Sequence, residues 1–286
     1  MRVLVTGANG FIGAHLVQEL EAKHEVIALA RNAPTFAPSS STRWIEHDLV
    51  EPLDAAPLPD AVDAVIHLAQ SRHYKQFPER ADDIFAVNID ATFRLLEYAR
   101  LAQAKAFVFA STGGVYGYSY ERFAETDPVS PLDFYLSSKY ATELLIANYR
   151  RFFRTIVLRF FFVYGQGQRG MLIPNLLDKV RNGETVTIEG RGLRINPIHV
   201  ADAVRVFEPA LALERSDLFN VCGDEAVDLS ALVRLMGEAA GNPASIEHIL
   251  GERDGDILGD NTRMKSVLGV RPRITLADGI ASMLES

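Results

Sequence analysis

The sequence predicts a Rossmann-like α/β fold, a doubly wound parallel sheet with helices on both faces, together with a smaller C-terminal lobe. Short apolar segments alternate with amphipathic segments along most of the chain. Several apolar segments, such as residues 64–69 and 106–110, are continuous hydrophobic runs. Strands of that kind are buried on both faces, as in a parallel sheet that helices cover.

The first strand and the turn after it make the same prediction. A strand at residues 2–6 runs directly into Gly7, Gly10 and Gly13, and a helix is expected over residues 11–22. The glycines allow a tight turn and a close approach of a pyrophosphate, which the N-terminus of the helix then faces. A glycine triplet alone is weak evidence, and a glycine-rich β-hairpin is the alternative. A second apolar strand at residues 25–30 favours the dinucleotide-binding interpretation.

The remaining elements follow the same alternation. We expect further strands near residues 43–47, 63–69, 105–111, 155–162 and 217–221, and helices near 80–102, 135–152, 171–182, 200–213 and 228–240. The segments 166–195 and 226–286 are less regular. We therefore assign residues 1–165 and 196–225 to a dinucleotide-binding domain, and residues 166–195 and 226–286 to a substrate-binding lobe.

Composition limits the class of protein. With 286 residues, 48% of them hydrophobic, the chain can form one large domain or a domain with a smaller lobe. A net charge of −8 opposes binding to nucleic acid or anionic membranes. The single cysteine, Cys222, excludes an internal disulfide and a multi-cysteine metal site, and we expect it to be buried. No signal peptide or membrane span is visible. We expect a cytoplasmic protein with a small-molecule substrate and no metal.

A tyrosine and a lysine at the start of one helix are candidates for proton transfer. Tyr135 and Lys139 are four residues apart, so they lie on one helix face. A lysine ammonium beside a tyrosine favours the phenolate, which makes the pair a candidate general acid/base. An ordinary amphipathic helix is the alternative. Thr112, at the end of the strand near residues 105–111, favours the acid/base interpretation, because ligands bind beyond the carboxyl ends of such strands.

Motifs along nearly the whole chain carry a family resemblance. They are Gly7-x-x-Gly10-x-x-Gly13, His67-Leu-Ala69, Asn88, Ser111-Thr112 ahead of Val115-Tyr-Gly117, Tyr135-x-x-x-Lys139, Arg159 with Val163-Tyr-Gly165, Pro197-Ile-His-Val-Ala-Asp202, Phe219-Asn-Val221 and Leu268-Gly269 with Pro272. In this order they resemble the extended short-chain dehydrogenase/reductases, the NAD-dependent epimerase/dehydratase family. The resemblance implies an enzyme, and we expect a homodimer.

The resemblance also assigns roles. It implies that Tyr135 is the acid/base, that Lys139 lowers the pKa of Tyr135 and binds the nicotinamide ribose, and that Thr112 orients the substrate. Asn88 is expected either to be structural or part of a proton relay, or to be a buried amide that bonds neighbouring backbone. The expected cofactor contacts are Gly7, Asn9, Gly10, Phe11, Ile12, Gly13, Arg31, Asn32, Asp48, Leu49, Leu68, Ala69, Gln70, Tyr135 and Lys139.

The end of the second strand bears on the choice of cofactor. An acidic residue there bonds the adenosine ribose in an NAD site, but this chain has Ala30 at that position, followed by Arg31. A guanidinium forms charge-assisted bonds to phosphate. The sequence therefore favours NADP over NAD, with NAD still possible. The alternative is that Arg31 is a solvated loop residue.

The substrate is less defined. Arg253 resembles the arginine that holds the diphosphate of a nucleotide sugar, and Arg194 is a second candidate for substrate binding. Phe162, Met171 and Ile195 depart from the family's usual nucleotide contacts, which leaves room for another sugar-like substrate.

Reaction type is narrowed by two observations. Family dehydratases carry an Asp-Glu pair after the threonine, whereas this chain has Gly113-Gly114, so dehydration is disfavoured. The expected NADP preference favours net reduction of a ketone. The alternatives are an NAD-dependent nucleotide-sugar epimerase and an NADP-binding redox sensor without turnover, although the Tyr135/Lys139 pair is not typical of a sensor. A structural or assembly protein on this fold is a third alternative.

Overall fold

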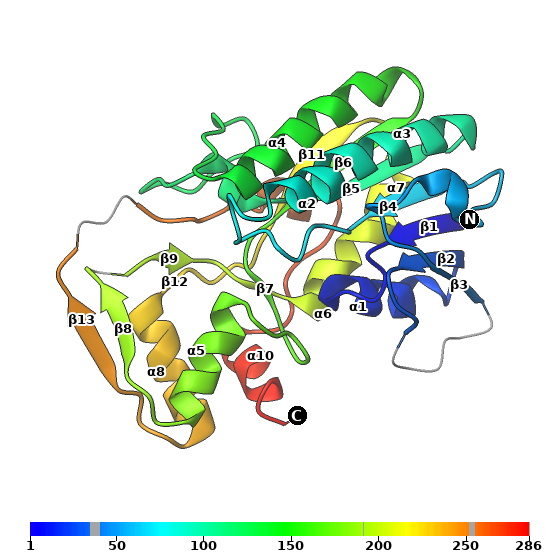
Figure 1. Cartoon of the computed structure of the whole chain (residues 1–286). Helices are drawn as coiled ribbons and strands as arrows, with labels where there is room; N and C mark the ends of the chain where they lie inside the picture. The colour runs from blue at the N-terminus through cyan, green and yellow to red at the C-terminus, as the bar shows by residue number, and fades with distance from the viewer. Residues whose placement is uncertain (35–40, 191, 252–254, 286) are drawn as a thin grey trace. The chain divides into compact units, whose positions relative to one another are not determined.

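The computed structural model describes residues 1–34, 41–190, 192–251 and 255–285, and the chain forms two compact units (Figure 1). The first unit comprises Met1–Val115, Ser130–Arg159 and Phe207–Phe219. The second unit comprises Tyr116–Val129, Phe160–Val206 and Asn220–Ser286. These units are defined by contacts in space, whereas the predicted domains are defined by motifs and regularity in the sequence. The predicted assignment of binding functions to domains therefore stays a prediction.

A seven-stranded sheet forms the centre of the first unit and confirms the predicted fold class. Its strand order is β11-β6-β5-β4-β1-β2-β3, and β1 pairs in parallel with both β2 and β4. The chain order reverses beside β1 and β4, so their carboxyl ends flank the ligand crevice of such a sheet. The strands are β1 (Arg2–Thr6), β2 (Glu25–Ala30), β3 (Thr42–Glu46), β4 (Ala64–His67), β5 (Ala106–Thr112), β6 (Arg154–Phe160) and β11 (Asp217–Val221).

Helices cover both faces of this sheet (Figure 1). One face carries α1 (Phe11–Leu20) and α7 (Phe207–Ala212), which His24 and Glu208 link through a 2.7 Å bond. The other face carries α2 (Ala81–Phe85), α3 (Ala91–Leu101) and α4 (Phe134–Ala147). The predicted helix at 80–102 is interrupted by a π-helical turn, Ala86–Asp90, which contains Asn88.

The core of the first unit lies between these helices and the sheet. Val3, Leu4 and Val5 of β1 have no exposed surface, as the continuous apolar pattern predicts. Around Leu4 pack apolar side chains from the strands and helices: Ile27, Leu29, Ile45, Val65, Leu95, Leu96, Phe107, Phe109, Ile146 and Val157. This core fixes the strand ends on which the candidate site depends.

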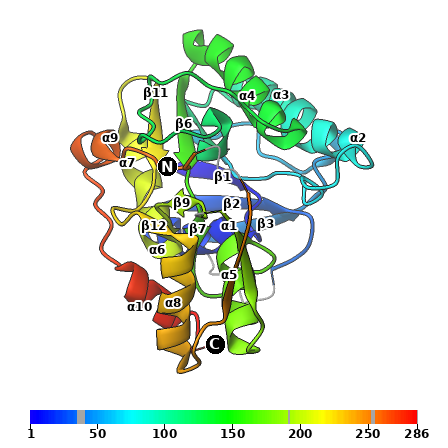
Figure 2. The same ribbon diagram turned by 90° about the vertical axis from the view of Figure 1, so that its left-hand side faces the viewer.

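The second unit packs helices against short paired strands (Figure 2). Its helices are α5 (Leu172–Arg181), α6 (Val200–Ala203), α8 (Leu229–Ala240), α9 (Thr262–Ser266) and α10 (Leu276–Ser282). Its strand pairs are β7 (Val163–Tyr164) with β10 (Ile198–His199), β9 (Arg194–Ile195) with β12 (Val227–Asp228), and β8 (Val186–Glu189) with β13 (Ile246–Ile249). The sequence did not predict these strands, because two- to four-residue strands carry almost no periodic signal.

Two smaller predictions are tested by the described residues. The thiol of Cys222 is free and fully buried, as expected. In the described part of the chain, no helix combines the length and the apolar character needed to cross a membrane.

Candidate active site

The glycine-rich turn after β1 has the geometry that a dinucleotide pyrophosphate needs. Gly7 has a φ of +69°, and a Cβ on it would lie 2.7 Å from the backbone nitrogen of Ala69. Gly10 precedes α1 in an extended conformation and has no side chain with which to cap the helix. The first N–H groups of α1 are therefore available to an anion, and the turn fits a bound dinucleotide.

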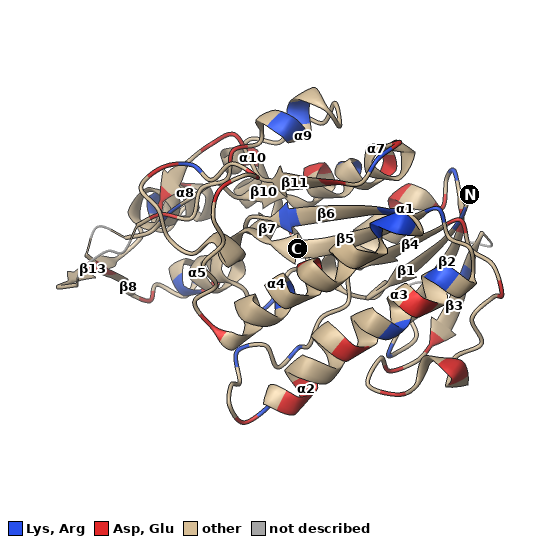
Figure 3. Cartoon of the chain, turned by 90° about the horizontal axis from the view of Figure 1, so that it is seen from above, with Lys and Arg blue, Asp and Glu red and all other residues tan. Residues whose placement is uncertain are grey.

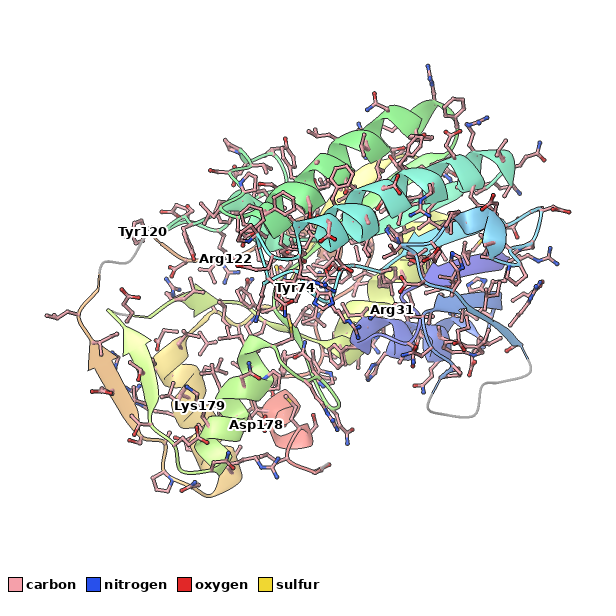
Figure 4. The ribbon with its side chains drawn as sticks, viewed as in Figure 1. Arg31, Tyr74, Tyr120, Arg122, Asp178 and Lys179 are labelled. Atoms are coloured by element: carbon pink, nitrogen blue, oxygen red, sulfur yellow. The ribbon has the colours of Figure 1, made fainter. Side chains whose placement is uncertain are left out.

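The ends of β2 and β3 carry the residues expected around the adenosine. Arg31 and Asn32 follow β2 and are exposed, and Figure 4 labels the Arg31 side chain near α1. The side-chain amide of Asn9 donates to the carbonyl oxygen of Ala33 at 3.2 Å, which ties the glycine-rich turn to this segment. Asp48 accepts from the backbone N–H of Val50, whereas the Leu49 side chain packs in the core.

His67, the last residue of β4, joins two strands and a helix through a neutral imidazole. The hydroxyl of Thr92 donates to the carbonyl oxygen of Asn88, so it accepts from His67 Nε2 at 2.9 Å. The other ring nitrogen, Nδ1, then accepts from the Thr6 hydroxyl at 2.6 Å. Burial, and secondarily the charge of Lys139, lower the pKa of His67 to about 3. The ring is therefore uncharged at neutral pH.

Asn88 connects the segment after β4 to helix α4. Its Oδ1 accepts from the backbone N–H of Ser71 at 2.9 Å, and its Nδ2 donates to the Ser138 hydroxyl at 2.8 Å. Ser138 in turn donates to the carbonyl oxygen of Tyr135 at 2.7 Å. The buried amide thus bonds neighbouring backbone, one of the two expected roles, and it also reaches the helix that carries Tyr135.

Helix α4 places the tyrosine and the lysine in its first two turns. Asp133 caps the helix by accepting from the backbone N–H of Leu136 at 2.7 Å. Tyr135 is half-buried, and Lys139, one turn later, is buried. Thr112 ends β5, and its hydroxyl oxygen accepts from the N–H of Gly114 at 3.2 Å. All three predicted catalytic residues therefore belong to the first unit.

The hydroxyl of Tyr135 is bonded to a side chain that follows β4. Its Oη donates to Gln70 Oε1 at 2.9 Å, and its ring lies 4.9 Å from the ring of Tyr74. Figure 4 labels the Tyr74 side chain. Burial raises the pKa of Tyr135 above its ordinary value, and Tyr74 and Asp133 raise it further, while the hydrogen-bonding partner Gln70 has the opposite effect. The phenol is therefore protonated in this structure.

Lys139 is directed at the end of β5. Its Nζ donates to the carbonyl oxygen of Ala110 at 2.5 Å and lies 4.2 Å from the centre of the Phe109 ring. Burial lowers the pKa of Lys139 to about 7, and the charge of Glu143 opposes that shift. The expected effect of Lys139 on the pKa of Tyr135 stays a prediction. Its role toward a nicotinamide ribose stays a prediction.

A buried ion pair lies one helical turn beyond Lys139, and sequence reasoning missed it. Glu143 accepts from Arg159 Nε at 3.0 Å and from an NH2 group of the same guanidinium at 2.6 Å. The hydroxyl of Ser111 also donates to Glu143. The sequence shows that Glu143 lies four residues after Lys139, but it does not show that Glu143 pairs with Arg159 on β6. The Ser111 hydroxyl is thereby bonded within this buried network, and the role of Thr112 toward a substrate stays a prediction.

The predicted substrate arginines belong to the second unit. The exposed Arg194 side chain lies 3.8 Å from the buried carboxylate of Asp256, which also accepts from the Arg194 backbone N–H at 2.9 Å. Arg253 falls outside the described residues. Its expected diphosphate contact stays a prediction.

The fold and these residues define a dinucleotide-dependent enzyme of the short-chain dehydrogenase/reductase type, with an uncapped glycine-rich turn and a tyrosine on α4. The sequence profile of the NAD dependent epimerase/dehydratase family matches residues 3–222. The chain therefore belongs to this family and is an enzyme of the extended short-chain type.

Known proteins resemble the chain over nearly its full length. The uncharacterized UDP-glucose epimerase YtcB of Bacillus subtilis is 30% identical, over 99% of this chain and 96% of that protein. A dTDP-4-dehydro-6-deoxy-D-allose reductase of Streptomyces bikiniensis is 31% identical, over 95% of this chain and 91% of that protein. The structure of a Bacillus cereus UDP-glucuronic acid 4-epimerase variant with a fluorinated substrate analogue and NAD superposes with a TM-score of 0.88, at 25% identity, over 100% and 98% of the two chains.

Proposed function

We propose that the protein is a nucleotide-sugar epimerase that uses NAD and inverts a carbon bearing a hydroxyl group. The observation that carries the proposal is the presence, in one compact unit, of a turn that fits a pyrophosphate together with the Tyr135 hydroxyl and Thr112. Relatives that cover nearly the whole chain support it, since they include a protein named as a UDP-glucose epimerase. This choice replaces net reduction, which the sequence favoured, with the alternative that the relatives support better.

Each residue has a task in this reaction. When bound, NAD supplies the acceptor and donor of hydride. The glycine-rich turn holds the pyrophosphate on the N–H groups at the start of α1. In its phenolate form, Tyr135 takes the proton of the sugar hydroxyl on Oη, and as the phenol it later returns that proton. Thr112 orients the same oxygen, and Lys139 holds the ribose.

Net reduction is retained as a second candidate because of one relative. The reductase of Streptomyces bikiniensis is as similar to the chain as the epimerase is. The two reactions are distinguished by the cofactor, because an epimerase regenerates NAD in each cycle and a reductase consumes a reduced cofactor. Conversion of a nucleotide sugar with catalytic NAD favours epimerisation, whereas stoichiometric loss of NADPH favours reduction.

Cofactor choice is part of the proposal. Neighbouring structures are named as complexes with NAD, while the exposed Arg31 after β2 is the feature that favours NADP. We give more weight to the neighbours, because the exposure of Arg31 does not by itself indicate a phosphate site. Direct titration decides the question, and clearly tighter binding of NADP than of NAD would contradict the choice of NAD.

A homodimer through α3 and α4 is also proposed. The two helices lie side by side, and the Tyr149 hydroxyl after α4 donates to Glu97 of α3 at 2.7 Å. Their surface exposes large apolar side chains: Phe93 by 47%, Leu101 by 70%, Leu144 by 53% and Phe152 by 49%. Charged residues of both signs are coloured along the ribbon of α2 and α3 (Figure 3). Exposed large apolar side chains on neighbouring helices are typical of an interface. Sedimentation as a monomer would contradict it.

The proposal is tested by Tyr135→Phe. The change removes only a hydroxyl, so α4 and the affinity for NAD are expected to persist. Turnover of UDP-glucose or another nucleotide sugar is expected to fall by at least about a hundredfold if the phenol transfers the proton. Near-normal turnover in this variant, with a substrate verified on the wild type, overturns the proposed chemistry. The cofactor titration shows that the variant is folded.

A further inference from the structure

Gln70 is hydrogen-bonded to the atom that the proposed reaction uses. It lies three residues beyond the end of β4, and its Oε1 accepts from Tyr135 Oη at 2.9 Å. The two residues are 65 positions apart in the chain. The Gln70 side chain is exposed, so this contact is not forced by close packing in a core.

The backbone on both sides of Gln70 is held in place. The N–H of Ser71 donates to buried Asn88 at 2.9 Å, and the N–H of Ala69 faces the Thr6 hydroxyl at 3.5 Å. Ala69 also packs against Gly7 so closely that a Cβ on that glycine would not fit. The Cα of Gln70 is therefore fixed relative to α4, while its terminal amide has room to turn.

We propose that Gln70 is a further catalytic residue, whose amide stays hydrogen-bonded to Tyr135 as that residue gains and loses its proton. The proposal rests on the proposed function, because it takes Tyr135 as the general acid/base. A carboxamide carries an acceptor oxygen and a donor NH2 group. It accepts from the phenol, and after rotation about its last bond it donates to the phenolate. An amide does not titrate, so it serves both states.

The charged and titratable groups around Tyr135 explain why such a partner matters. Asp133 at the N-terminus of α4 and the neighbouring Tyr74 both disfavour the phenolate, and burial disfavours it more. The amine of Lys139 is bonded to the carbonyl of Ala110 instead of to the phenol. Among the described residues, Gln70 holds the hydrogen bond to Oη, and its NH2 group, once the amide has turned, donates to the phenolate and opposes these effects.

Two substitutions at Gln70 separate its chemical role from its shape. Gln70→Glu keeps the size but places a carboxylate beside Oη, which opposes the phenolate, and Gln70→Ala removes the partner. The rising limb of the pH dependence of kcat/KM for epimerisation reports the loss of the Tyr135 proton. We expect its midpoint to move up by about one pH unit or more in Gln70→Glu, and by less in Gln70→Ala. NAD affinity is measured by titration in each variant, because Gln70 is also among the expected cofactor contacts, and the pH profiles are compared at saturating NAD.

Gln76 provides a matched control in the same segment. Its side chain is exposed and accepts from His73 at 2.9 Å, away from Tyr135. Gln76→Glu adds the same charge and is expected to leave the pH midpoint unchanged. An unshifted midpoint in Gln70→Glu, or an equal shift in Gln76→Glu, overturns the role of Gln70 while leaving the epimerase proposal intact. Full activity of Tyr135→Phe overturns both.

Discussion

Two buried polar networks lie behind the candidate active site in the first unit, and they are built from opposite chemistry. In the first network, neutral groups are linked through His67, which bonds the hydroxyls of Thr6 and Thr92. In the second, Glu143 and Arg159 form an ion pair with both side chains at most 6% exposed. Each network fixes a different strand end relative to a helix of the site.

The two networks differ in the change that disrupts them. The His67 network depends on one tautomer, because the ring must donate from Nε2 and accept at Nδ1. A proton added to Nδ1 breaks it, so the network is sensitive to pH. The Glu143–Arg159 pair depends on the presence of both charges, because a buried charge without its partner is strongly unfavourable. It is therefore sensitive to the loss of either residue.

The largest expected effect comes from breaking the ion pair. Glu143→Gln leaves the Arg159 guanidinium buried beside a neutral amide, and we expect the free energy of unfolding to fall by about 3–5 kcal/mol. Arg159→Met should cost a similar amount. The double variant Glu143→Gln/Arg159→Met should be more stable than either single variant, because no buried charge remains. Urea denaturation measures all three, and additive losses in the double variant would show that the pair is not coupled.

A smaller, pH-dependent effect is expected from His67. Its pKa in the folded state is lowered to about 3 from an ordinary 6.5. Between these values the unfolded chain binds a proton that the folded chain excludes, so stability is lost as the pH falls. The loss from this residue is expected to approach about 1.4 kcal/mol per pH unit well inside that window. In His67→Gln, the free energy of unfolding, measured by urea denaturation, should fall less steeply between pH 6 and 4. As a control, the same substitution at His73, a histidine in the segment after β4, should keep the wild-type slope.

The sequence predicted what is local in the chain and missed what joins distant elements. The glycine-rich turn and the interior strands of the sheet follow from spacing and hydrophobic pattern, and the structure contains them. The bond from Tyr135 to Gln70 and the pairing of Glu143 with Arg159 join residues from different elements. No periodic signal encodes such contacts. The short strands of the second unit were missed for a related reason, since two residues do not establish a period.

The smallest expected effect concerns Ser111, which belongs to the charged network but adjoins Thr112. Ser111→Ala removes one donor to Glu143, whose carboxylate still accepts from Arg159, so no charge loses its partner. The free energy of unfolding is expected to fall by only about 1 kcal/mol. Turnover should stay close to that of the wild type, because the Ser111 hydroxyl is buried and directed at Glu143.

Thr112→Val is the matched comparison at the neighbouring position. It removes the half-buried hydroxyl that we assign to the substrate, so turnover should fall while the affinity for NAD is retained. If Ser111→Ala lowered turnover as much as Thr112→Val, the assignment of the two hydroxyls to different networks would be wrong. Ser111 would then have to leave Glu143 when the substrate binds, and the ion pair would be part of the catalytic cycle instead of its fixed support.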